Sequence, residues 1–192
     1  MNNTLTDIIS IDSMEETRLP IMSNTQWVVN SLTKTLPYFE LAGYHLELQN
    51  HGAPSCPDIS LNEEEASEIK PQAWLEIINS QEYWLYNYPG ACVEAKYLGK
   101  KIPNLSQWME MFASMPGDVE TKIQVLNIPL VGCHSAGDGK VYGANLYADI
   151  WSSSARAHNA HFVFLERCGL KVYPRQANRA SGKSLRFLSN QK

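Results

Sequence analysis

The sequence predicts an α+β domain, with helices in the middle of the chain and short strands toward its C-terminal end. Apolar residues recur at helical spacing over Val93–Leu98 and Leu105–Phe112, and Gly99 follows the first segment at the position where a helix commonly ends. Beyond residue 132 the chain is punctuated by glycines, which is typical of turns between strands. The strand candidates in this part are His161–Leu165 and Ser184–Leu188.

The remaining elements are predicted from weaker patterns. Apolar residues at helix-like spacing predict a helix over Thr25–Leu36, which Pro37 would end. A short third helix is expected over Val119–Leu126. The other segments are a short strand within 38–48, a loop over His51–Ser60 and a capped acidic helix or turn over Asn62–Ala73.

Length and composition fit a globular chain. The 192 residues are 44% hydrophobic and 19% charged, which is close to ordinary globular values and leaves room for one domain with its own core. We place that domain at 81–192 and leave the role of 1–80 open, because this part either completes the domain or docks to a carrier. We predict no structural metal and no disulfide framework, since the cysteines are scattered without a C-x-x-C pair.

No stretch approaches the roughly 20 apolar residues that a membrane span needs. The first twenty residues carry four acidic side chains and no continuous apolar run, which argues against a secretory signal peptide. A cytoplasmic location is therefore the default expectation, and an export route without such a signal stays open.

Charge is distributed unevenly along the chain. Residues 151–192 contain eight basic residues and one acidic residue, a net charge of +7, whereas residues 1–150 contain eight basic and nineteen acidic residues, a net charge of −11. Such asymmetry suggests a nucleic-acid partner. A binding track for nucleic acid would also need aromatic residues between the basic ones, and only Tyr173 is a good stacking candidate there. Nucleic acid is therefore the less favoured partner.

Several motifs of the C-terminal half resemble a known family. In order, they are Leu126-Asn127-Ile128-Pro129-Leu130-Val131-Gly132, Asp149-Ile150-Trp151-Ser152-Ser153-Ser154, Ala160-His161-Phe162-Val163-Phe164 and Ser181-Gly182-Lys183-Ser184-Leu185-Arg186. The series resembles the Fibrobacter-type major paralogous domains (FISUMP). The segment Ala95–Trp108 is similar to a stretch of the formylglycine-generating-type domains. The resemblance covers about residues 90–188, and Gln107, Lys183 and Leu185 depart from the commoner family residues.

This resemblance implies a C-type-lectin-like fold with two helices and short antiparallel strands. It also implies a ligand-binding protein, because the FISUMP group includes variable proteins diversified by retroelements. The varied region would then be about 155–180. We expect Trp151, Ser152, Phe162, Phe164 and Val172 to form a buried frame in which serine hydroxyls serve the Trp151 indole N–H.

In a strand, residues 161, 163 and 165 share the face opposite Phe162 and Phe164. We therefore expect this second face to be exposed and to be part of one contiguous recognition surface. The expected ligand-binding residues are Arg156, His158, His161, Val163, Leu165, Arg167, Cys168, Tyr173, Arg175 and Ala177.

A codon argument supports the same set. In retroelement-diversified proteins the varied codons usually begin as Asn codons, and replacing the two adenines of AAC or AAT reaches every residue type except Lys, Glu, Gln, Met and Trp. All the expected ligand-binding residues are reachable. Glu166, Lys171 and Gln176 are not, so we assign them to fixed sequence. Asn159 and Asn178 fit unchanged template codons.

The alternatives are an adhesin that is not diversified, a nucleic-acid-binding module and, less favoured, a formylglycine-generating-type oxidase. The oxidases use a cysteine pair, and here Cys133 and Cys168 stand in contexts that do not match that site. We predict no catalytic residues and no cofactor. The calcium-site motifs of sugar-binding C-type lectins are absent, so no calcium site is inferred. The partner is expected to be an unidentified protein or surface ligand.

Overall fold

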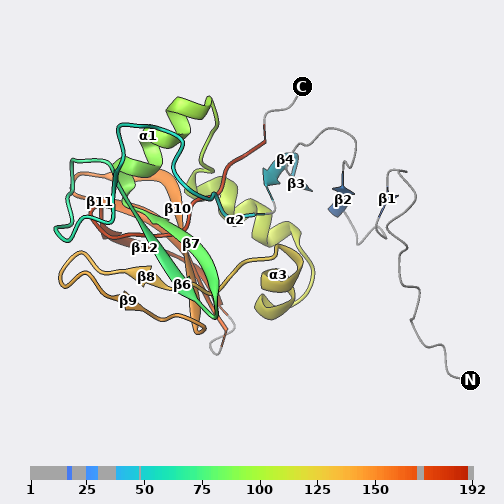
Figure 1. The fold of residues 1–192 in the computed structure, drawn as a ribbon. Helices are drawn as coiled ribbons and strands as arrows, with labels where there is room; N and C mark the ends of the chain where they lie inside the picture. Colours follow the sequence, from blue (N-terminus) through green and yellow to red (C-terminus); the bar gives the residue numbers. More distant parts are fainter. Residues whose placement is uncertain (1–16, 19–24, 30–37, 48, 168–170, 190–192) are drawn as a thin grey trace, which may run out of the picture.

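The computed structural model describes residues 17–18, 25–29, 38–47, 49–167 and 171–189, with side-chain positions left out at 17–18, 25–29, 38–39 and 171–173 (Figure 1). The helices are α1 (Tyr88–Leu98), α2 (Leu105–Ser114) and α3 (Val119–Val125). None of these helices is long and apolar enough to cross a membrane. The strands are β1 (Thr17–Arg18), β2 (Thr25–Val29), β3 (Tyr38–Leu41), β4 (Tyr44–Glu47), β5 (Ser60–Leu61), β6 (Gln72–Ile78), β7 (Gln81–Tyr86), β8 (Cys133–His134), β9 (Val141–Tyr142), β10 (Tyr147–Arg156), β11 (Asn159–Glu166) and β12 (Lys171–Asn178).

The central sheet is antiparallel, in the order β10-β11-β12. Its register places Ile150 opposite Val163 and Val163 opposite Pro174. The register between β10 and β11 shifts between Trp151 and Ala155, as at a β-bulge, so the regular pairing of the two strands is interrupted there. Strands β6 and β7 form a second antiparallel pair, and β1 to β4 form a separate four-stranded sheet. The α+β class predicted from the sequence is confirmed at this level.

Both faces of the central sheet are covered by side chains. On one face Val163 and Leu165 pack in an apolar cluster with Trp108 of α2. On the other face Phe162 and Phe164 pack with Trp151 and with residues of β7, α1 and the C-terminal segment. Because both faces of the sheet are covered, successive side chains from Phe162 to Leu165 are buried alternately in these two clusters.

The residues between 41 and 80 contribute to the same two clusters. Leu41 and Leu46 are fully buried among the side chains of α2 and β11, while Ile59 and Ala73 lie in the cluster around Phe162. Part of the segment whose role the sequence left open therefore lies in the core that the C-terminal half builds.

One segment near the C-terminus joins several elements. We call residues 182–189 the stitch. Its backbone pairs with β8 through Gly182 and with β7 through Lys183, and Ser184 donates its N–H to the Asp149 carbonyl of β10. Farther along, the stitch reaches β4 and the segment after α1 through Leu188. The sequence predicts a regular strand over Ser184–Leu188, whereas the structure has isolated bridges to different partners.

The helix predictions are confirmed for α1, α2 and α3. Asn104 caps α2 with a capping box, in which its side chain accepts from the Gln107 N–H and the Gln107 side chain accepts from the Asn104 N–H. The predicted helix over Thr25–Leu36 is wrong over Thr25–Val29, which is strand β2, and residues 30–37 lie outside the described residues. The predicted helix or turn over Asn62–Ala73 is a loop that continues into β6.

Two buried basic residues of the stitch are held by polar partners. Lys183 forms an ion pair with Asp149, and both side chains are at most 4% exposed. Arg186 is fully buried and donates to the Asn50 side chain and to the carbonyls of Leu126 and Asn127. Burial lowers the pKa of Arg186 to about 9, which still leaves its guanidinium charged at neutral pH.

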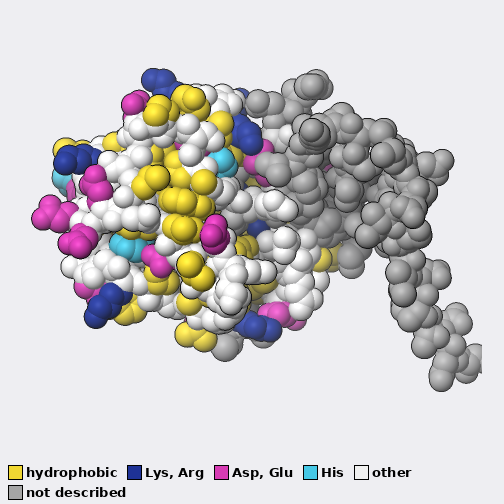
Figure 2. All heavy atoms as spheres, viewed as in Figure 1, with side chains coloured by type: hydrophobic (Ala, Val, Ile, Leu, Met, Phe, Trp, Pro, Cys, Tyr) yellow, Lys and Arg dark blue, Asp and Glu magenta, His cyan; other side chains and the backbone are white. Residues whose placement is uncertain are grey.

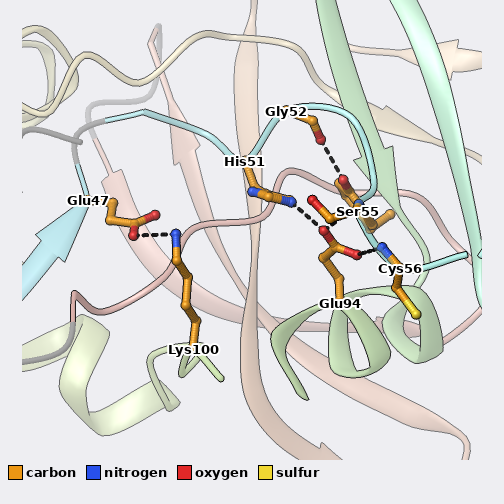
Figure 3. Close-up of polar contacts among 8 residues, drawn as sticks. Glu47, His51, Gly52, Ser55, Cys56, Glu94 and Lys100 are labelled. Atoms are coloured by element: carbon orange, nitrogen blue, oxygen red, sulfur yellow. Dashed lines mark hydrogen bonds and ion pairs between the residues drawn. The ribbon is translucent and has the colours of Figure 1, made fainter. Parts of the chain in front are cut away.

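A buried carboxylate fastens the segment before β5 to α1 (Figure 3). Glu94 of α1 is fully buried and accepts hydrogen bonds from the backbone N–H groups of Ser55 (2.7 Å) and Cys56 (2.8 Å). Its carboxylate also lies 2.8 Å from His51 Nε2. Burial alone would raise the pKa of Glu94, but these hydrogen bonds outweigh burial and hold that pKa below its usual range.

We expect Glu94→Gln to lower the free energy of unfolding at pH 7 by about 1–3 kcal/mol, because an amide cannot accept from all three donors. Because the pKa of Glu94 is lower in the folded state than its unfolded value of about 4.3, ionised Glu94 stabilises the folded protein at pH values above 4.3. This stabilisation is lost as the pH falls through the pKa of Glu94 in the folded state. Denaturant unfolding at pH 7 and at acid pH measures both effects. Equal losses for the variant at both pH values would contradict this role, and Glu82→Gln, at an exposed position of β7, is the control.

Candidate binding surface

The expected recognition residues lie on the β10–β11 hairpin and on β12. Arg156 pairs with Asn159, so the hairpin turns over two residues, Ala157 and His158. Ala157 has a φ of 49°, in the left-handed region where Asn and Gly are the usual hairpin residues. The turn therefore carries a residue that is not optimal for stability, at the tip of an otherwise well-packed sheet.

Five accessible residues of the expected set lie at this turn or on the adjoining parts of β10, β11 and β12. Arg156, His158 and Arg175 are exposed, with the His158 side chain 89% accessible, and His161 and Ala177 are half-buried. We call these five residues the hairpin surface. His161 and Arg175 lie on opposite faces of the sheet, because paired neighbours alternate across β11 and β12. The hairpin surface thus wraps around the tip and around β12, which is the outer strand of this sheet.

The prediction that Val163 and Leu165 are exposed is wrong. Both side chains are fully buried, in the cluster that contains α2 and α3. The physical reason is that the helices cover the face that we expected to be open, so β11 has two buried faces rather than one. These two residues belong to the frame that supports the hairpin.

The prediction of one contiguous surface also fails at Arg167. This residue follows the far end of β11, where its guanidinium lies 3.4 Å from the Glu120 carboxylate of α3. The eight residues of β11 separate it from the turn by roughly 25 Å of extended strand. Cys168 lies outside the described residues, and the side chains of Val172 and Tyr173 are likewise not described, although their backbone forms part of β12.

The frame prediction is confirmed for Trp151, Ser152, Phe162 and Phe164, which are all at most 5% exposed. The expected partner of the Trp151 indole is wrong, because Nε1 donates to the Tyr86 carbonyl and not to a serine hydroxyl. The serine hydroxyls stabilise the bend of β10 instead. Ser152 Oγ accepts from the Ser154 N–H, and Ser154 Oγ accepts from the Leu105 N–H at the start of α2.

The loop before β6 also reaches the hairpin surface, which the sequence did not indicate. One oxygen of Glu68 lies 3.3 Å from His158 Nδ1, and the other accepts from Asn178 Nδ2 at 2.8 Å. Nothing in the spacing of Glu68, ninety residues before His158, could have predicted this contact. The loop contributes an acidic residue to an otherwise basic surface.

The hairpin surface offers hydrogen-bond donors and cationic groups on a rigid support. Arg175 lies over the Phe164 ring at 3.9 Å, so its guanidinium is oriented by an aromatic face. Within the described part of the chain no group of three or more His, Cys, Asp or Glu residues is arranged to hold a metal ion. The exposed guanidinium groups of Arg156 and Arg175 can donate hydrogen bonds to acceptor groups.

Cys133 and His134 illustrate why neighbours in sequence do not form a nucleophile–base pair here. They are successive residues of β8, so their side chains leave opposite faces of the strand. The Cys133 thiol lies 3.6 Å from the Tyr147 hydroxyl, while the His134 ring stacks on Trp74. Burial raises the pKa of Cys133, which opposes formation of a thiolate.

Comparison with known proteins adds no relative. No family model matches the chain, and neither a curated protein nor a solved structure matches it.

Proposed function

We propose that this chain is a binding protein that presents a variable recognition surface on a C-type-lectin-like scaffold of the FISUMP kind. Its diversification would be carried out by a retroelement that acts on codons within about 155–180. The observation that carries the proposal is the division of one hairpin into two classes of residue. Ala160, Phe162, Val163 and Leu165 of β11 are buried on two faces, whereas Arg156 and His158 are exposed at the turn and Arg175 is exposed on the neighbouring strand β12.

This division matches what a diversified surface requires. Exposed residues away from buried networks usually change stability by no more than about 0.5 kcal/mol when substituted. Buried residues in a closely packed core cost several times more. A hairpin with a fixed interior and exposed outer residues can therefore change its ligand without losing its fold.

We expect a library randomised at Arg156, His158, His161 and Arg175 to remain mostly soluble and to melt cooperatively. A control library at four buried positions of β11, Ala160, Phe162, Val163 and Leu165, should be mostly misfolded. The folded fraction of each library, measured by thermal unfolding of individual members, decides between the two classes. If both libraries misfold to the same extent, the hairpin surface is structural and the proposal fails.

Genomic context tests the retroelement part separately. We expect a reverse-transcriptase gene near this one, together with a near-copy of the segment that encodes the hairpin. Substitutions among related copies should fall at the exposed positions and spare the codons of Phe162 and Trp151. A non-diversified adhesin on the same scaffold would lack both the reverse transcriptase and the near-copy.

A nucleic-acid partner is less well supported. Two of the eight basic residues in 151–192, Lys183 and Arg186, are buried in contacts with the protein itself. Arg167 follows the end of β11 that is far from Arg156, and its guanidinium lies against the Glu120 carboxylate, so these two arginines are not neighbours on the surface. A steep loss of affinity with added salt would nevertheless favour this class over a protein ligand.

A further inference from the structure

The outer strand of the central sheet has an open edge. Strand β12 pairs with β11 on one side, and within the described parts of the chain no strand pairs with its other side. Residues 174–178 are exposed except for Ala177, which is half-buried. The backbone groups on the open side of β12 are therefore accessible to a partner strand.

The register shows which backbone groups of β12 lie on the open side. Arg179 donates its N–H to the His158 carbonyl at 3.3 Å, in line with the register between β11 and β12. In an antiparallel ladder, residue pairs that exchange hydrogen bonds alternate with pairs that do not. The odd-numbered residues of β12 therefore direct their N–H and C=O groups toward β11, and the even-numbered residues direct theirs to the open side.

Pro174 agrees with this alternation. Proline has no N–H, and at an even-numbered position its ring replaces a group on the open side and not a bond to β11. Pro174 thus offers only its C=O there, whereas Gln176 offers both its N–H and its C=O. Asn178 offers only its N–H, because its carbonyl already accepts from the Ser181 N–H at 3.1 Å.

The opposite edge of the sheet, along β10, is closed by other parts of the same chain. The Trp151 N–H donates to the Ser184 carbonyl, and the Asp149 carbonyl accepts from the Ser184 N–H, both at 3.0 Å. The Tyr147 carbonyl accepts from the Gly132 N–H at 2.9 Å. Among the described residues, β12 is therefore the side on which the sheet can accept a further strand.

We propose that the open edge of β12 pairs with β12 of a second copy of this chain, antiparallel and with Gln176 at the two-fold axis. Gln176 of each copy then exchanges both backbone hydrogen bonds with Gln176 of the other, and the Asn178 N–H donates to the Pro174 carbonyl of the other copy. The same patch serves on both subunits, as a two-fold contact requires. The two three-stranded sheets become one continuous sheet.

The groups that are missing from this edge match each other in this register. Pro174 has no N–H to offer and its ring needs space, while Asn178, which lies opposite it, directs its carbonyl to Ser181. A shift of two residues would place Gln176 opposite Pro174 or Asn178, and one of its backbone groups would then lose its partner. A strand of unrelated sequence would present a free carbonyl to the proline ring. The edge is therefore better matched to itself than to a general extended peptide.

The side chains leave room for this contact. Arg175 would lie opposite Ala177 of the second copy, so no like charges face each other directly. The Arg175 guanidinium carbon also lies 3.9 Å from the centre of the Phe164 ring of its own sheet. Because backbone groups make the contact, the pairing does not depend on the proposed diversification of the hairpin surface.

Amide hydrogen exchange tests the pairing residue by residue. In the full chain, we expect the N–H groups of Gln176 and Asn178 to exchange rapidly in dilute solution and more slowly as the protein concentration is raised. Arg175 and Ala177 donate to β11 at every concentration, so their exchange should not change in this way. Exchange of Gln176 and Asn178 that is independent of concentration would overturn the proposal, as would an equal slowing at all residues of 175–178.

Two variants of Gln176 separate the backbone from the side chain. Gln176→Pro removes the N–H at the two-fold axis from both copies, and it should weaken self-association, measured by sedimentation equilibrium, at least about tenfold. Gln176→Ala keeps both backbone groups, so it should associate like the wild-type chain. If Gln176→Pro fails to fold, the exchange measurement on the wild-type chain still decides. A wild-type chain that stays monomeric at every concentration would overturn the proposal.

Association through side chains is the rival outcome. Figure 2 shows hydrophobic side chains in the middle of the face on which Figure 1 places β6 and β7, and Ile77 of β6 is 69% exposed. Self-association that persists in Gln176→Pro and is lost in Ile77→Ser would place the contact on that face and overturn the pairing of β12. Loss in Gln176→Pro, with Ile77→Ser unchanged, is the result we expect.

Discussion

Replacing Trp151 by alanine is expected to lower the free energy of unfolding by about 3–5 kcal/mol, the usual cost of deleting a buried aromatic side chain. The residue is fully buried and packs edge-on against Tyr88 and Phe162, with ring centroids 5.6 and 6.2 Å away. Its indole donates to the Tyr86 carbonyl, which also accepts from the Lys183 N–H, so alanine removes one of two donors to that buried acceptor. Chemical denaturation with an unchanged m-value would measure the loss.

A matched variant separates packing from hydrogen bonding. Trp151→Phe removes the indole N–H but keeps most of the ring volume, so it should cost less than Trp151→Ala. Trp84→Ala, at a half-buried position of β7, is the control for a tryptophan outside the centre of the cluster. If Trp151→Ala unfolds at the same denaturant concentration as the wild-type chain, Trp151 is not part of the frame.

Replacing Lys183 by methionine is expected to cost about 3–5 kcal/mol, the typical effect of removing one partner of a buried ion pair. Asp149 would then be a buried carboxylate without its ion-pair partner, and one of its oxygens, Oδ1, already makes no hydrogen bond with the described residues. The Lys183 ammonium also lies 3.8 Å from the centre of the Phe162 ring, a contact that methionine would only partly replace.

The double variant Asp149→Leu/Lys183→Met should recover most of this loss, because it removes both charges together. Burial raises the pKa of Asp149 even beside Lys183, so the carboxyl can take a proton when the lysine is absent. The difference in free energy of unfolding between the wild-type chain and Lys183→Met should therefore become smaller as the pH is lowered. Two results together would contradict a buried ion pair. The double variant would be as unstable as Lys183→Met, and the stability lost by Lys183→Met would be the same at every pH.

The sequence predicted the helices well because their signals are local. The capping residue Asn104, the glycine after α1 and the apolar spacing of α2 are all contained within one or two turns. The burial of Phe162 and Phe164 followed from the alternation of a single strand. These features depend on neighbours in the chain, so the sequence carries them directly.

The exposure of Val163 and Leu165 was predicted wrongly because alternation alone does not reveal how many faces of a strand are covered. A signal was present, since Phe162 to Leu165 is a continuous apolar run of the kind found in strands that are buried on both faces. The contacts of Glu94, Lys183 and Glu68 join residues that are far apart in the chain. No local pattern predicts such pairs, because they depend on how the elements pack.

The stitch has a consequence for the order in which this chain can fold. Strands β4, β7, β8 and β10 all lie earlier in the chain, yet each forms backbone contacts with residues 182–189. During synthesis these strands cannot complete their backbone hydrogen bonds until that segment has left the ribosome. Until then, the backbone N–H and C=O groups at their edges and the aromatic rings around Trp151 stay accessible to solvent. Three of the backbone hydrogen bonds of this segment, from Phe187 to Glu47, from Leu185 to His51 and from Ser189 to His45, join residues more than 130 positions apart, and such long-range contacts are associated with slow folding. We therefore expect an incompletely folded, aggregation-prone intermediate to persist for longer during synthesis than the size of the chain suggests. We also expect a chaperone to bind this intermediate and not the native protein.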